Sequence, residues 1–531
     1  MALHTLEIIR MFMKRILCIL ICCFLCKIGS AFGQTLYLPN PGSGLMVDYL
    51  DEYLTNHNSN FYRTGNDFVY FPINKFLTDE CIKKGKIDET VLYNNIKGVY
   101  DRVLKFSRNR RYIICIGCSY DGNCQLDPYL VTSQKGERIY CWYPPKMYYL
   151  ISKQKYPPMV TKAIYPDKFK ETKLVSILDI RNKFVKKVYD SILRLFGRYL
   201  EEPVEAPVLK SATNAARQCT KGDFVSRIEI NFIGPWGEGI TTYYSDYENA
   251  DDFIYITELY KKYLCKYWLI APSYGMRTNT TKNKNLYAFQ YYLLTTTYGS
   301  LKKDKNGLYY GDKEFGLGVS HLGEDDYKYD FDLSYNNYDF KEIASQKCLI
   351  APFVGENSGM VLKESTMLMD NIKEYGVSLC KPWTRVSIKN IPETALQKWR
   401  DAASFFGYRF YITNNNTSIK DGRLNLFFLM GNSSYSPLYD DFWLPQIVIR
   451  DKDEKELRVI DIDKDLNLRK IPCKKSPLNY EVMVNTKKQV GNVPDGVKVY
   501  FRVIDKCHIN ENMYLDNDGR TGKGEYLLLK L

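Results

Sequence analysis

The stretch Arg227–Gly239, RIEINFIGPWGEG, decides the fold of this chain. Its first eight residues are rich in isoleucine and phenylalanine, which predicts a buried β-strand over residues 227–234. Glycine and proline then end the strand, and Trp236 and Glu238 follow at once. An aromatic ring and a carboxylate directly after a buried strand are typical of parallel barrels, whose reactive groups follow the carboxyl ends of the strands.

Working outward from this stretch, short apolar runs alternate with helix-like stretches up to about Phe406. The pattern predicts strands over residues 68–73, 111–118, 159–164, 227–234, 268–272, 315–320, 349–354 and 377–379. It predicts helices over residues 88–106, 178–200, 251–264, 286–298, 338–345, 361–375 and 392–406. Eight strands that alternate with seven helices predict an α/β fold of the (β/α)8 TIM-barrel type. An open doubly wound sheet is the main alternative, and the lack of a glycine-rich phosphate loop after the first strand disfavours it.

Beyond residue 406 only short strands and turns are predicted. The strand candidates are residues 408–413, 424–429, 446–450, 459–462, 482–484, 497–504 and 525–529. Turn signals such as Asp421-Gly422 and Asp518-Gly519 separate them. This pattern predicts an all-β sandwich domain over residues 407–531, following a barrel domain over residues 34–406.

The first 33 residues have the three parts of a secretory signal peptide. Lys14 and Arg15 precede the apolar run ILCILICCFL, and small residues at Ala31 and Gly33 suit cleavage before Gln34. The apolar run is short for crossing a bilayer of about 30 Å, which disfavours the alternative of a membrane anchor. We therefore expect an exported protein, periplasmic, cell-surface or secreted, without stable membrane insertion after cleavage.

Composition narrows the partners and the cofactors. The net charge is +13, but lysines are scattered along all 531 residues, so we expect no nucleic-acid partner. Of 15 cysteines, Cys18, Cys22, Cys23 and Cys26 lie in the signal peptide, which leaves an odd number, 15 − 4 = 11. The C-x-x-C of Cys115 and Cys118 lies in the apolar run RYIICIGC, which predicts a buried strand. Finger spacing with histidines is missing, so we expect no metal and no cofactor.

Two glutamates follow predicted strands on opposite sides of the barrel. Glu238 comes after the fourth predicted strand, and Glu356 comes after the seventh within Gly355-Glu356-Asn357. Retaining glycosidases need such a pair: one carboxyl protonates the leaving oxygen and the other attacks the anomeric carbon at a separation of about 5 Å. The pair therefore predicts the catalytic residues of a glycoside hydrolase.

Aromatic and polar residues after other strands predict a carbohydrate-binding rim. The candidates are Trp236 beside Glu238, His321 after the sixth strand, Trp383 after the eighth, and Trp142 and Tyr143 after the second. Aromatic rings with one polar end suit sugar faces. A serine or cysteine nucleophile is disfavoured because the chain has no G-x-S-x-G motif.

The runs IEINFIGPWGEG, APFVGE and FFGYRFYI resemble bacterial exported proteins of a glycoside-hydrolase-like family of unknown function, which combine a barrel with a C-terminal sandwich. The family is similar to clan A of the glycoside hydrolases. The resemblance implies that Glu238 is the acid/base, that Glu356 is the nucleophile and that Trp383 is an aromatic floor. In clan A an asparagine usually precedes the acid/base and contacts the sugar 2-hydroxyl, whereas this chain has Gly237.

The sequence therefore predicts an exported, glycoside-hydrolase-like protein that acts by retention on a poly- or oligosaccharide. The alternative is a catalytically inactive glycan-binding or surface-associated barrel protein, since one fold serves many functions. A third hypothesis gives the main role to the C-terminal sandwich, which would dock onto another surface protein.

Overall fold

We describe a computed structural model of the chain. It describes residues 44–48, 66–104, 111–117, 128–163, 173–204, 219–231, 250–272, 284–296, 301–303, 309–311, 317–322, 334–335, 338–358, 372–383, 404–477, 480–506, 512–517 and 524–531. Residues Leu38–Leu531 form one compact unit.

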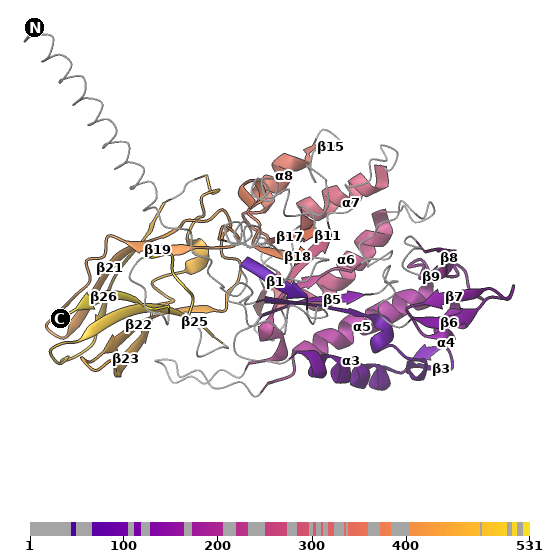
Figure 1. Cartoon of the computed structure of the whole chain (residues 1–531), viewed down its shortest axis with the longest axis horizontal. Coiled ribbons are helices and arrows are strands. Elements are labelled where there is room, and N and C mark those ends of the chain that lie inside the picture. The colour runs from indigo at the N-terminus through magenta and orange to yellow at the C-terminus, as the bar shows by residue number, and fades with distance from the viewer. Residues whose placement is uncertain are drawn as a thin grey trace, which may run out of the picture. The chain divides into compact units, whose positions relative to one another are not determined.

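Eight strands close into a barrel in which each strand pairs in parallel with its neighbours (Figure 1). In chain order they are β1 (Gly44–Asp48), β2 (Asn66–Pro72), β5 (Arg111–Gly117), β10 (Val225–Glu229), β11 (Trp268–Pro272), β14 (Gly318–Leu322), β17 (Phe353–Ser358) and β18 (Leu379–Trp383). The circle closes where β1 pairs with both β2 and β18. The chain is thus an α/β protein with a closed parallel barrel.

Two predictions about the barrel strands are wrong, and the two errors cancel in the numbering. The first barrel strand is β1, which the sequence did not suggest because the strand has only five residues, GLMVD, and begins with glycine. The predicted strand 159–164 is β8 (Met159–Lys162), which lies in another sheet. Its alternating exposure shows a half-exposed strand, whereas barrel strands are buried on both faces. Consequently β10 is still the fourth barrel strand and β17 the seventh.

Helices cover the barrel, each packed on the next one in chain order. They are α3 (Glu89–Val103), α5 (Lys183–Leu200), α6 (Ala250–Leu264), α7 (Lys284–Thr295) and α8 (Phe340–Lys347). All five were predicted, although α5 starts five residues later than expected because Asn182 caps its first turn. The predicted helix over 361–375 lies largely outside the described residues, and that over 392–406 does so as well.

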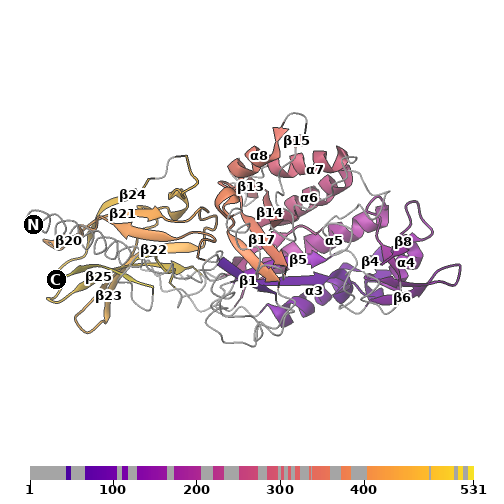
Figure 2. The same ribbon diagram turned by 45° about the horizontal axis from the view of Figure 1, so that its top comes forward.

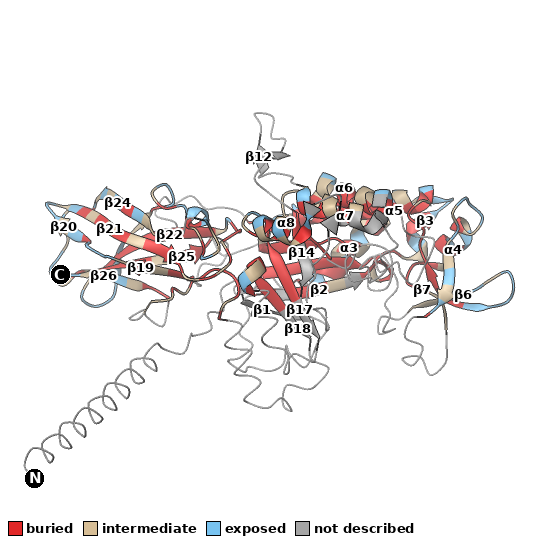
Figure 3. Cartoon of the chain, turned by 90° about the horizontal axis from the view of Figure 1, so that it is seen from above, coloured by how far each residue is buried: buried red, intermediate tan, exposed pale blue. Residues whose placement is uncertain are grey.

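Alternation along the strands separates two hydrophobic layers. Ile114, Ile228 and Leu269 belong to the large core between strands and helices. Their neighbours Ile113 and Ile270 belong instead to a small cluster with Phe68, Cys115, Val354 and Leu379. The small cluster draws on strands around the ring, so it marks the barrel interior. Figure 3 shows the buried residues along these strands.

A separate four-stranded sheet interrupts the barrel between β5 and α5 (Figure 2). Its order is β6 (Tyr129–Thr132), β7 (Arg138–Cys141), β9 (Leu174–Ile177) and β8, and the helix α4 (Pro145–Ile151) lies between β7 and β8 in the chain. A short hairpin, β3 (Ile82–Lys83) and β4 (Lys86–Ile87), follows β2. Because these insertions follow barrel strands and precede helices, they belong to the carboxyl end of the barrel.

The C-terminal region forms two four-stranded antiparallel sheets. The first contains β19 (Phe410–Thr413), β20 (Ser418–Lys420), β21 (Arg423–Asn432) and β24 (Val482–Gln489). The second contains β22 (Trp443–Arg450), β23 (Glu456–Asp461), β25 (Lys498–Asp505) and β26 (Tyr526–Lys530). Buried side chains of both sheets form one hydrophobic cluster. All seven predicted strands are present; the additional strand β20 joins β21 through Asp421-Gly422, whose φ angles of 51° and 70° suit a tight hairpin turn.

The C-terminal sheets contact the amino-terminal ends of the barrel strands. Arg111, the first residue of β5, donates to Asp505, the last residue of β25, and both side chains are fully buried. Arg227 of β10 donates to Asp440 at 2.5 Å. The ring of Trp268, which begins β11, meets that of Tyr439 edge-on. The C-terminal region therefore packs against the neighbouring barrel strands β5, β10 and β11 near their amino ends.

The remaining short elements lie between these larger ones. They are the hairpins β12 (Leu301–Lys303) with β13 (Tyr309–Gly311) and β15 (Ser334–Tyr335) with β16 (Tyr338–Asp339), and 3-10 turns over Ile73–Lys75, Asp79–Cys81, Lys221–Phe224 and Leu468–Lys470. Among the helices that the structure describes, none has the length and apolar character needed to span a bilayer.

Candidate functional site

Glu356 lies near the carboxyl end of the seventh barrel strand, β17. The strand extends to Ser358, four residues beyond the predicted end, so Glu356 lies inside β17 rather than in a loop. It stands two residues after Val354, a member of the interior cluster, and in register with Lys381 of β18. The backbone of Glu356 is therefore part of the parallel pairing between β17 and β18.

The predicted partner, Glu238, lies outside the described residues, and so does Trp236. The fourth strand, β10, ends at Glu229, and the N–H of Ile230 still donates to the carbonyl of Ile270 at 2.8 Å. The description stops at Asn231, seven residues before Glu238. The structure therefore places the strand that leads to Glu238 but not the glutamate.

His321 and Trp383 occupy the carboxyl-terminal halves of barrel strands. His321 is the fourth residue of β14, and its neighbour Leu322 is in register with Gly355. Trp383 ends β18 in register with Ser358. Both predicted residues thus belong to strands adjacent to β17, the strand of Glu356.

Trp142 and Tyr143 belong to the protein core. Their exposed fractions are 1% and 2%, and both pack within the large hydrophobic cluster. The Tyr143 hydroxyl shares a hydrogen bond of 2.5 Å with Ser176 of β9. Because both rings are packed inside this large core, they present no face to a ligand.

A buried carboxylate that the sequence analysis did not single out lies on the fourth barrel strand. Glu229 has an exposed fraction of 5% and is in register with Cys115 and Ile270, two members of the interior cluster. The sequence signal was its place between Ile228 and Ile230, both of which face the helices. An acid that alternates with outward-facing isoleucines faces the barrel interior.

Two further polar contacts line the same end. The Asn231 amide donates to the Cys115 Sγ at 3.4 Å, and its backbone N–H donates to the Tyr260 hydroxyl at 3.3 Å. Gly117, the last residue of β5, leaves room for the Tyr70 ring, since a Cβ there would lie 2.5 Å from the Tyr70 hydroxyl. Asn231 and Tyr70 therefore hold polar groups at the carboxyl ends of the fourth and second strands.

Cysteine chemistry receives no support from the described residues. Among the described cysteines, the free thiols include Cys81, Cys141, Cys265, Cys348 and Cys473. Burial raises the pKa of the Cys141 thiol to about 12, which keeps it protonated and unreactive at neutral pH. Among the residues that the structure describes, no group of three or more His, Cys, Asp or Glu side chains is placed to hold a metal ion.

The fold and these residues define a closed parallel-barrel protein with acids on its fourth and seventh strands and C-terminal antiparallel sheets. No family model matches the chain, and no curated protein matches it in sequence.

Several solved structures show a distant likeness. Endo-glycoceramidase II from Rhodococcus sp., in complex with a cellobiose-like imidazole, has 9% identity and a TM-score of 0.33, with 80% of this chain and 96% of that chain covered. The GH20 catalytic modules of the pneumococcal exo-β-D-N-acetylglucosaminidase have 11% identity and a TM-score of 0.32, covering 70% and 83%. An endo-β-1,4-mannanase double mutant from Cellulomonas fimi has 9% identity and a TM-score of 0.27, covering 83% and 84%. These neighbours are glycoside hydrolases, but at such scores the barrel here rests on its own strand pairing.

Proposed function

We propose that this chain is an exported glycoside hydrolase that cleaves a poly- or oligosaccharide by retention. One observation carries the proposal: Glu356 lies near the carboxyl end of the seventh strand of a closed parallel barrel. Reaction sites of such barrels lie at the carboxyl end, where several strands deliver side chains to one opening.

In this proposal Glu356 is the nucleophile and Glu238 is the acid/base. Glu238 protonates the leaving oxygen while Glu356 attacks the anomeric carbon, and Glu238 then activates the water that releases the sugar. Trp236, His321 and Trp383 bind the substrate at the same end. The chemistry needs the two carboxyl groups about 5 Å apart, whereas a separation of about 6.5–9.5 Å belongs to inverting enzymes.

A Glu356→Gln variant tests the nucleophile. We expect hydrolysis of aryl glycosides to fall by about a thousandfold or more, because the amide cannot form the covalent intermediate, while sugar binding persists. Glu342→Gln, an exposed change on α8, serves as the matched control and keeps full activity. Turnover by Glu356→Gln at the parent rate contradicts the assignment.

The same assay separates the enzyme from its alternative, a glycan-binding barrel without activity. NMR of the first-formed sugar shows retention if the mechanism is correct. Binding to glycans with no product from any substrate, and no effect of Glu356→Gln, favours the inactive alternative. The buried Glu229 provides a third variant: if only Glu229→Gln abolishes turnover, the acid on the fourth strand was misassigned.

Export belongs to the same proposal and rests on the first 33 residues of the sequence. Amino-terminal sequencing of protein recovered from outside the cytoplasm is expected to begin at Gln34. A product that begins at Met1 contradicts it.

A further inference from the structure

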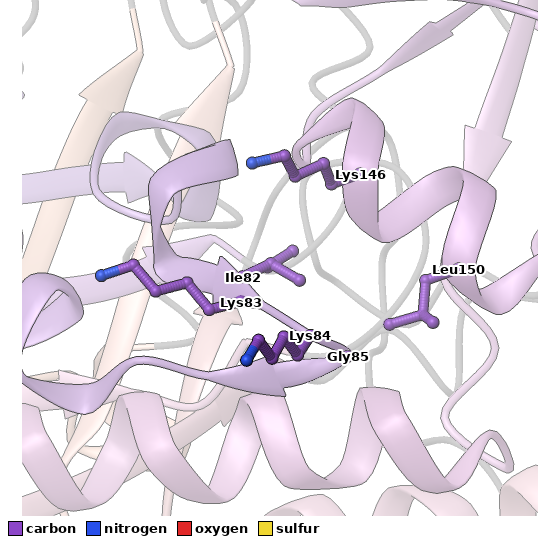
Figure 4. Close-up of a pocket in the computed structure, with 6 residues that line it drawn as sticks. All are labelled: Ile82, Lys83, Lys84, Gly85, Lys146 and Leu150. Atoms are coloured by element: carbon purple, nitrogen blue, oxygen red, sulfur yellow. The ribbon is translucent and has the colours of Figure 1, made fainter.

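A recess of about 650 Å³ lies between the β3–β4 hairpin and α4 (Figure 4). Three of its lining residues are lysines, Lys83, Lys84 and Lys146, and the others are Ile82, Gly85 and Leu150. No carboxylate is among them. In Figure 4 the ammonium ends of the lysines lie toward one edge of the recess and Leu150 lies toward the other. The recess thus combines lysine ammonium groups with two apolar side chains, while the carboxylates of Asp79 and Asp88 contact Lys146 and Lys83 without lining it.

The hairpin that carries two of these lysines is held in a defined conformation. Lys84 and Gly85 form its two-residue turn with φ angles of 49° and 70°, and Ile82 and Lys83 pair with the returning strand. The Lys83 ammonium pairs with Asp88 at 2.6 Å, and the same carboxylate accepts from the N–H of Val91 as the cap of α3. Asp88 therefore holds the Lys83 ammonium in place by an ion pair.

The third lysine is fixed to the hairpin through Asp79. The N–H of Lys146 donates to the Asp79 carboxylate at 2.8 Å, and its ammonium donates to the Asp79 carbonyl at 3.1 Å. Asp79 lies just before the hairpin, so α4 and the hairpin are tied together across the recess. For the Lys84 ammonium, in contrast, the described part of the chain offers neither an ion pair nor a hydrogen bond. The Lys84 side chain is exposed, so an anion from solvent can reach it.

The chain order places this recess on the same end of the barrel as Glu356. The hairpin follows the second barrel strand and α4 follows the third, so both belong to the loops at the carboxyl end. We propose that the recess binds the carboxylate or sulfate groups of an acidic glycan, with Lys84 and Lys146 as the main contacts. This inference rests on the proposed function and adds a substrate class to it. Ile82 and Leu150 offer apolar surface to the C–H face of a sugar ring.

The test is a binding measurement on the full mature chain that needs no turnover. The probes are dextran sulfate against uncharged dextran, and polygalacturonate against its methyl ester, so that charge varies on one backbone. We expect binding to the charged member of at least one pair, weaker at high salt because surface charges are screened. Equal binding of the charged and uncharged members overturns the proposal.

The variants are Lys84→Gln and the pair Lys84→Gln/Lys146→Gln, with Lys153→Gln as the matched control. Lys153 is exposed, lies just after α4 and does not line the recess. We expect the double variant to bind about fivefold more weakly or worse, the single variant to be intermediate, and the control to match the parent. Lys84→Gln alone removes no contact within the described chain, so it keeps the test valid if the double variant does not fold.

The outcomes separate this inference from the proposed function. Unchanged binding in the double variant overturns the recess while leaving hydrolysis by Glu356 intact. Loss of acidic-glycan binding in the lysine variants, with the parent hydrolysing no substrate, supports the recess and contradicts the enzyme. Duplex DNA or phosphatidylglycerol vesicles that bind as tightly, with the same loss in the lysine variants, overturn the assignment to a glycan.

Discussion

Glu202, two residues beyond α5, accepts hydrogen bonds from three side chains that are distant in sequence. The Tyr93 hydroxyl lies at 2.6 Å, the Lys97 ammonium at 2.7 Å and the Lys221 ammonium at 2.8 Å. Tyr93 and Lys97 come from α3, whereas Lys221 begins the 3-10 helix Lys221–Phe224 that precedes β10. One carboxylate therefore ties two helices to the entry of the strand that leads to Glu238.

This contact makes stability depend on pH. Burial alone would raise the pKa of the Glu202 carboxyl, but hydrogen bonds from Lys221, Lys97 and Tyr93 outweigh it and lower the pKa to about 2. Since the pKa in the folded state lies below the ordinary value of 4.5, the ionised carboxylate stabilises the fold above about pH 4.5. That contribution is lost as the pH falls from 4.5 to 2.

We expect Glu202→Gln to lower the free energy of unfolding at pH 7 by about 2 kcal/mol. Urea unfolding at several pH values measures it, and the difference from the parent should shrink toward zero near pH 2. Glu201→Gln is the control, because its carboxylate is about half exposed and pairs with Lys266 at the surface. A constant difference across the pH range contradicts the ion-pair explanation.

At the scale of elements, the start of α5 shows how one side chain joins two segments. The side-chain oxygen Oδ1 of Asn182 accepts hydrogen bonds from the backbone N–H groups of Phe184 at 2.8 Å and Val185 at 3.3 Å. Its amide donates to the carbonyls of Lys155 and Tyr156, which follow α4. The cap therefore also holds the inserted sheet against the barrel helix, and its side chain is fully buried.

We expect Asn182→Ala to destabilise the protein by about 2 kcal/mol, because it removes a cap and two part-buried hydrogen bonds to the carbonyls of Lys155 and Tyr156. The control is Asp339→Ala at the more exposed cap of α8, for which we expect about 1 kcal/mol. Guanidinium unfolding of both variants gives the comparison. Equal losses would show that the amide contacts of Asn182 contribute nothing.

At the scale of the whole molecule, buried ion pairs join the barrel to the C-terminal sheets. The Arg111 guanidinium lies 3.8 Å from the ring centre of Phe442 while it pairs with Asp505. Arg227 and Asp440 form the second buried pair. A buried charge is tolerated only when it has such a partner. The C-terminal sheets therefore contribute to the stability of the barrel.

We expect Arg111→Met to cost about 3–5 kcal/mol because it leaves Asp505 buried and unpaired, and Arg111→Met/Asp505→Leu to recover much of that loss. Thermal unfolding of the single and double variants measures the coupling. For the same reason, a chain that ends at residue 406 should not fold. A stable barrel from that truncation would favour the hypothesis that the C-terminal region is a separate docking module.

Alternation and turn chemistry in the sequence determined most of the elements. The run RYIICIG predicts a strand because a strand buried on both faces needs apolar residues throughout. Asp421-Gly422 predicts a turn because a tight hairpin needs residues that adopt a positive φ. The five-residue strand Gly44–Asp48 shows no such pattern in its sequence. Only its pairing in the closed barrel identifies it as a strand.

The site divides in the same way. The sequence by itself assigned Glu356 to the seventh strand, but this count is right only because the missed β1 and the misassigned β8 cancel, and Glu356 lies within β17 rather than after it. The sequence did not show that Trp142 and Tyr143 are buried or that Glu229 faces the barrel interior. Those outcomes depend on which segments pair, and pairing is decided by long-range packing that no local pattern of residues encodes.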